Sequence, residues 1–138
     1  MAVGLKVGPI FYQIGTGSFL HCFFSNIAHY LEEGNWGSKY PILMNHLYKG
    51  SIENKDLEQF KIELNHIREA FKEYHPNMAI WEIENLDSKP PWGNTIADRI
   101  TSLSNYFYTS DGRDLFDVFI LASDAATQVN KNLEIKTL

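Results

Sequence analysis

The side chains in this sequence that could do chemistry are five histidines, one cysteine and a group of acids near tryptophans. Cys22 could act as a nucleophile if a histidine served as its base. A lone cysteine beside an apolar run is more often a small buried residue of the core. We therefore expect Cys22 to be structural and predict no catalytic residue.

The spacing of the histidines argues against a metal site. His21 and Cys22 are adjacent, and neighbours on a helix point to different sides of it, so they make a poor pair of zinc ligands. His21 and His29 would share a helix face but lie about 12 Å apart along its axis, too far to bind one ion. The chain has no HxxxH or CxxC spacing. We predict no metal and no cofactor.

The run GTGS at residues 15–18 superficially resembles a phosphate-binding loop between a strand and a helix. It lacks both the GxGxxG spacing and the lysine of a P-loop. A turn followed by a helix is the simpler interpretation, with Ser18 as the residue that caps the helix.

Residues 77–94 carry the most unusual combination of side chains. Residues 79–84 alternate in the two-residue period of a strand, which would place Glu82 and Glu84 about 7 Å apart on one face. Such a pair could serve as general acid and base, or could simply be a solvated strand face. Two prolines, Pro90 and Pro91, then hold Trp92 on a stiff, extended segment.

Tryptophans on rigid loops near acidic residues are typical of protein interfaces. The loop at residues 34–38 carries a second tryptophan, followed by glycine as Trp92 is. We therefore predict a protein-binding surface that consists of Trp36, Glu82, Glu84, Asp87 and Trp92. The alternative is that both tryptophans only close the edge of the core.

Hydrophobic periodicity and turn residues predict the elements that must position these side chains. We expect strands at residues 5–14, 79–84, 105–109 and 133–137, and helices at residues 19–32, 40–48, 57–74 and 114–129, with a short helix at 95–103. The fold class is then α+β, in which a small sheet of about three to four strands packs against four helices. Residues 1–138 form a single domain on this interpretation.

Composition restricts the class of partner. Twelve basic and 17 acidic residues give a net charge of −5, which argues against nucleic acid as a partner. One cysteine fits a reducing compartment. Neither a signal-peptide pattern nor an apolar run approaching 18 residues is visible, so we expect a cytoplasmic protein that does not enter a membrane.

Several segments together resemble one family, the bacterial immunity protein 70 family of polymorphic toxin systems. The resembling segments are GTGSFLH with FFS at residues 15–25, WGS with PILMN at 36–45, WEIENL at 81–86, PPWG at 90–93, and LSNYF through TSDGRDL at 103–115. The resemblance implies a small α+β cytoplasmic protein that binds and neutralises a cognate toxin and has no catalytic residues. It supplies no mapped interface.

Two other functions remain open from the sequence. One is a small-molecule-binding protein or enzyme, with an aromatic-lined pocket near residues Gly15 to His21. A deep pocket with converging polar groups would favour that function. The other is a homo-oligomer that adds strands at a sheet edge.

Overall fold

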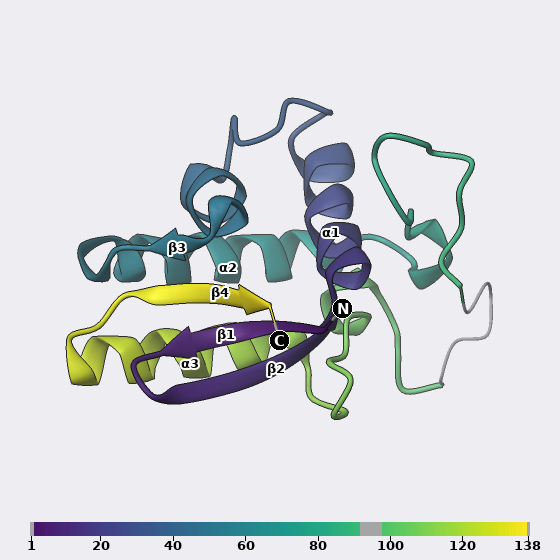
Figure 1. Cartoon of the computed structure of the whole chain (residues 1–138). Helices are drawn as coiled ribbons and strands as arrows, with labels where there is room; N and C mark the ends of the chain where they lie inside the picture. Colours follow the sequence, from purple (N-terminus) through teal and green to yellow (C-terminus); the bar gives the residue numbers. More distant parts are fainter. Residues whose placement is uncertain (1, 92–97, 138) are drawn as a thin grey trace.

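A four-stranded sheet lies on one side of the molecule, and the long helices lie behind it (Figure 1). The computed structural model describes residues 2–91 and 98–137. The strands are β1 (Ala2–Val7), β2 (Ile10–Thr16), β3 (Ser51–Ile52) and β4 (Leu133–Thr137), in the order β2-β1-β4-β3. All three strand pairs are antiparallel. The α+β class predicted from the sequence is confirmed.

The four main predicted helices are also present. They are α1 (Gly17–Asn26) with its continuation η1 (Ile27–Leu31), then η2 (Ile42–Leu47), α2 (Leu57–Phe71) and α3 (Leu115–Val129). Both η1 and η2 are π-helical turns. Short 3₁₀ turns occur at η3 (Asn54–Asp56), η4 (Pro76–Met78) and η5 (Leu103–Asn105). Within the described ranges, no helix is both long and apolar enough to cross a lipid bilayer.

The core is built from one face of the sheet and the inner faces of the helices. Leu5 and Ile14 of the sheet are fully buried above α3. Phe23 of α1 is the centre of an aromatic cluster, with its ring 5.2–5.6 Å from those of Phe107, Phe116 and Phe119. The high aromatic content of the chain is therefore used mainly to fill this core.

The single strand predicted at residues 5–14 is wrong, because this stretch contains parts of two strands, β1 and β2, which form an antiparallel hairpin. Gly8 and Pro9 form the turn between β1 and β2. Gly8 has a φ of +55°, which a tight hairpin turn favours and which glycine adopts without strain. Apolar residues continue on both sides of the turn, so periodicity alone did not separate the strands. The cap of α1 is Thr16, whose Oγ1 accepts from Phe19 N at 3.1 Å, and not Ser18.

The strand predicted at residues 79–84 is wrong. This segment joins no sheet and has only an isolated bridge between Glu82 and Asn85 within a turn. The strand predicted at 105–109 is likewise only a bridge, between Tyr108 and Asp114. Of the helix predicted at 95–103, residues 98–102 are not helical and residues 95–97 lie outside the described ranges.

Candidate functional site

Residues 79–91, here called the strap, lie beside α1 and are held there by one buried side chain (Figure 1). Asn26 is fully buried at the end of α1. Its Oδ1 accepts from Ile80 N at 2.9 Å, and its Nδ2 donates to Ile80 O at 3.0 Å. The amide of Asn26 thus satisfies both backbone groups of Ile80, as a neighbouring strand would. Because the amide of Asn26 takes the place of a neighbouring strand, residues 79–84 alternate in sequence but do not join a sheet.

Cys22 is part of the same attachment. It is fully buried, as the sequence predicted, and its thiol donates to Ile80 O at 3.2 Å. Burial raises the pKa of Cys22 to about 12, so the thiol stays protonated at neutral pH. Among the residues described, no group of three or more His, Cys, Asp or Glu side chains could hold a metal ion.

His21 connects the strap to the second π-helical turn. Its Nε2 donates to Glu84, at 2.7 Å from Oε1 and 3.0 Å from Oε2. Its Nδ1 lies 3.2 Å from the hydroxyl of Tyr48, next to η2. The hydrogen bond from His21 lowers the pKa of Glu84. Three segments that are distant in sequence therefore meet at one imidazole ring.

Trp36 lies beside this junction and is half-buried. Its Nε1 donates to Met44 O at 2.8 Å. Its ring centroid is 4.8 Å from that of Tyr48 and 6.1 Å from that of His21. Trp36 therefore packs against the edge of the core, behind His21.

The loop that carries Trp36 is shaped by two buried carboxylates that the sequence patterns did not reveal. Glu32 is 3% exposed and accepts hydrogen bonds from the backbone N–H groups of Gly37, Lys39 and Tyr40 at 2.9–3.0 Å. Glu63 is 4% exposed and accepts from Leu43 N at 2.9 Å, at the start of η2.

Burial raises the pKa of Glu63, although these backbone hydrogen bonds oppose the rise. The spacing of the apolar residues in 57–74 leaves Glu63 off the apolar stripe of α2, yet its side chain is buried. The first turn of η2, which the period of α2 does not report, donates two backbone N–H groups to this carboxylate, from Ile42 and Leu43.

A pocket of about 250 Å³ opens between the first turns of α1, the end of η2 and the strap. It is lined by Gly17, Ser18, His21, Tyr48, Trp81 and Glu82. We call it the α1 pocket. It lies where the sequence left an aromatic-lined pocket open, but its rings come from Tyr48 and Trp81, which are far from residues 15–21 in sequence. Nothing in the sequence around Tyr48 or Trp81 indicates that these residues lie beside residues 17–21.

The structure brings together three of the five residues predicted for a binding surface. Glu82 lines the α1 pocket, Glu84 binds His21 at its rim, and Trp36 stacks behind His21. Asp87 is exposed further along the strap, where its backbone N–H donates to Asn85 Oδ1 at 3.2 Å. Trp92 lies outside the residues that the structure describes.

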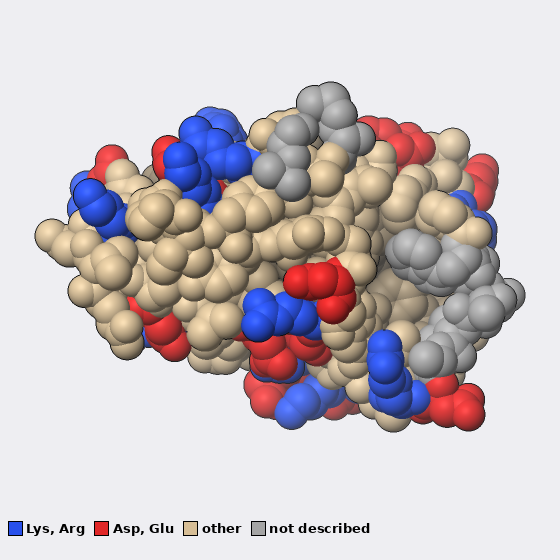
Figure 2. Space-filling view, turned by 60° about the horizontal axis from the view of Figure 1, so that its bottom comes forward, with Lys and Arg blue, Asp and Glu red and all other residues tan. Residues whose placement is uncertain are grey.

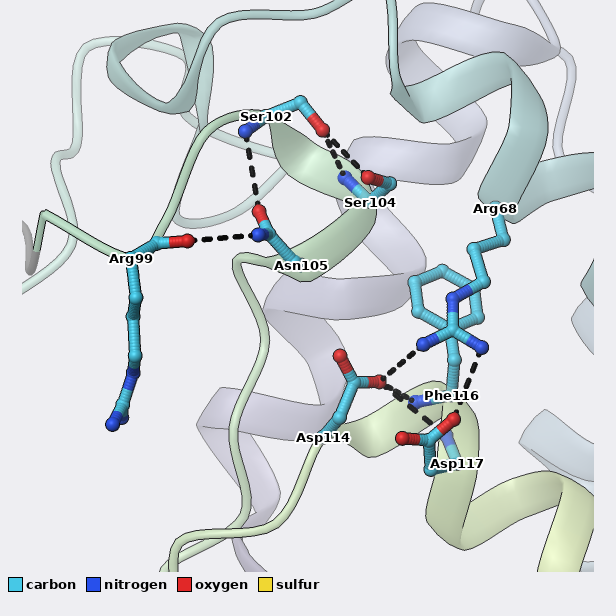
Figure 3. A network of polar contacts seen from close by, with 8 residues as sticks. All are labelled: Arg68, Arg99, Ser102, Ser104, Asn105, Asp114, Phe116 and Asp117. Carbon is cyan, nitrogen blue, oxygen red and sulfur yellow. Dashed lines mark hydrogen bonds and ion pairs between the residues drawn. The ribbon is translucent and has the colours of Figure 1, made fainter.

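The TSDGRDL segment, in contrast, has a structural task. Asp114 caps α3 by accepting from Phe116 N at 2.9 Å and Asp117 N at 3.3 Å (Figure 3). Arg68 of α2 reaches the same cap, with its guanidinium 3.5 Å from Asp114 and 3.0 Å from Asp117. Burial raises the pKa of Asp114, and the charge of Arg68 partly offsets that effect. This segment therefore positions α3 and does not belong to the site.

The comparisons with known proteins agree with the resemblance seen in the sequence. A family model described as immunity protein 70 matches residues 5–135, which is nearly the whole chain. Neither the curated proteins nor the solved structures contain a significant match to it.

Proposed function

The chain belongs to the immunity protein 70 family, and on this premise we propose that it binds and neutralises a cognate bacterial toxin without catalysing a reaction. The family match over residues 5–135 is the observation that carries the proposal. We place the protein in the cytoplasm, where a toxin made by the same or a sibling cell would act.

The toxin-binding surface that we propose is the side of the molecule around the α1 pocket. The residues that we assign to toxin binding are those predicted from the sequence, Trp36, Glu82, Glu84, Asp87 and Trp92, of which Trp92 lies outside the described residues. Support comes from the gathering of Trp36, Glu82 and Glu84 around one imidazole ring, and from the exposure of Glu84 and Asp87 to solvent. A half-buried tryptophan with acidic neighbours has the composition of an interface with a few dominant residues.

Co-expression with the toxin domain encoded by the adjacent gene tests the proposal. We expect the chain to restore growth of cells that make the toxin, and to co-purify with the toxin domain in a fixed ratio. Co-expression that neither rescues growth nor yields a complex would overturn the proposed function. If the complex forms but the Trp36→Ala and Glu84→Ala variants bind equally well, the function stands and the proposed surface is wrong.

The alternative function, binding or conversion of a small molecule, is supported by the position of the α1 pocket. A volume of about 250 Å³ is below the range of about 300–1,000 Å³ that is usual for ligand pockets. The only thiol of the chain, in Cys22, is buried away from solvent and protonated. The pocket is therefore better suited to a single side chain of a partner than to a metabolite.

A further inference from the structure

The α1 pocket contains an acidic group that the fold does not use. Glu82 is partly buried in the pocket wall, and its carboxylate makes no hydrogen bond or ion pair with the described part of the chain. Its neighbour Glu84, in contrast, is bound to His21. Glu82 therefore offers, at the pocket wall, a carboxylate unpaired among the described residues to a cation from outside.

The remaining walls of the pocket suit a flat cation. Tyr48 and Trp81 are among the lining residues, and no lysine or arginine is among the described lining residues. Cations bind over the faces of tryptophan and tyrosine, and a guanidinium group can stack on a ring while it donates two parallel hydrogen bonds to a carboxylate. An ammonium group lacks that planar geometry, so the combination favours arginine over lysine.

We propose that the α1 pocket receives an arginine side chain of the toxin domain, which pairs with Glu82 beside Tyr48. The inference rests on the proposed function, because it names the group of the toxin that the surface recognises. It assigns the central contact to Glu82. Glu84 and His21 hold the strap in place at the rim, and the net charge of −5 favours a basic partner.

The first experiment needs no toxin. N-acetyl-arginine amide and its neutral isostere N-acetyl-citrulline amide are titrated into the protein, and the tryptophan indole N–H and histidine ring signals are followed by NMR. We expect the arginine compound to shift the signals of Trp81 and His21 at millimolar concentration, and the Glu82→Gln variant to lose this response. Equal shifts by the citrulline compound would show that charge does not matter and would overturn the proposal.

The second experiment uses the toxin domain. Glu82→Gln should weaken its binding at least about tenfold, because an arginine would lose its charged acceptor in a partly buried site. Glu58→Gln is the matched control, since Glu58 is an exposed acid in the first turn of α2 and the charge change is identical. Glu82 has no described side-chain contact, so its substitution should leave the melting temperature unchanged.

The outcomes separate the two proposals. If the toxin binds and both variants bind as well as the wild type, the arginine inference fails while the proposed function stands. If the toxin does not bind the wild type at all, the proposed function fails, and the arginine inference fails with it. Arginine-compound binding would then show only that the pocket accepts a cation.

Discussion

Asn26 illustrates at the residue scale how one side chain can replace a strand. Its amide pairs with both backbone groups of Ile80, which is itself only 6% exposed. The sequence shows asparagine inside a helix, where its propensity is modest, and gives no hint of the partner. The pairing depends on a contact between residues 54 positions apart, and only the folded chain creates it.

Replacing Asn26 with alanine should lower the free energy of unfolding by about 2–3 kcal/mol, because the buried N–H of Ile80 loses its partner and the carbonyl of Ile80 keeps only the weak donor of the Cys22 thiol. Urea unfolding followed by circular dichroism measures the effect. Asn26→Asp should be at least as harmful, since a carboxylate would face the carbonyl oxygens of Cys22 and Ile80. Wild-type stability in both variants would show that the hydrogen bonds between Asn26 and Ile80 contribute little to the free energy of unfolding.

Ser25, the neighbour of Asn26, should behave in the opposite way. Its hydroxyl is fully buried and has no hydrogen-bond partner among the described residues. Ser25→Ala removes the unsatisfied group and should raise the free energy of unfolding by about 1 kcal/mol. The same urea titration measures it. A loss of stability instead would mean that the hydroxyl is hydrogen-bonded in solution.

At the scale of elements, the strap is attached at one end by Asn26 and further along by the pair of His21 and Glu84. The second attachment is exposed, since the side chain of Glu84 is 60% accessible, and solvent screens it. The strap is therefore firmly fixed near Ile80 and more weakly held near Glu84. An element that is fixed at one end can adjust to a partner at the other.

The strap should respond to acid. The pKa of Glu84 is lowered in the fold from its ordinary value of 4.5, so its bond to His21 contributes stability above that value. This contribution is lost as the pH falls through the folded-state pKa of Glu84. Tryptophan fluorescence, which reports on Trp81 and Trp36, should therefore change below about pH 4.5. In the Glu84→Gln variant that change should be absent, and identical curves for the two proteins would contradict the assignment.

At the scale of the whole molecule, the face that contains α3 and β2 has an extended uncharged area (Figure 2). In Figure 2, this broad area lies on the left of the face, and a group of acidic and basic side chains lies near the middle of the face. Ile10 of β2 and Leu121 and Val129 of α3 are exposed apolar side chains of these elements. β2 is also an edge strand without a charged residue, and charged side chains are a common protection of such edges.

We expect the protein to self-associate weakly through this edge at high concentration. Light scattering at two concentrations should show a rise in mean mass, and Ile10→Lys should suppress the rise because a charge on the edge opposes strand pairing. Ile62→Lys is the control, since Ile62 is 55% exposed on α2, away from the sheet. A constant monomer mass at both concentrations would rule out this association.

The sequence by itself determined the elements whose pattern is local. The stripes of α2 and α3, the strand at the C-terminus and the α+β class follow from periods of 3.6 and 2 residues, and all were found. The burial of Cys22 was also predictable, because an apolar helical stretch surrounds it. Asp114 directly precedes the apolar residues of α3, which is a typical sequence position for a helix N-cap.

Only the tertiary structure decided what the strap and the site are. The alternation of residues 79–84 is a real strand signal, but a segment becomes a strand only when a strand edge is free to pair with it. Here the side-chain amide of Asn26 pairs with the backbone of Ile80 in place of a strand edge, and Glu84 forms a hydrogen bond with His21. The α1 pocket joins residues 17–21, 48 and 81–82, and contacts of such separation leave no periodic trace in the sequence.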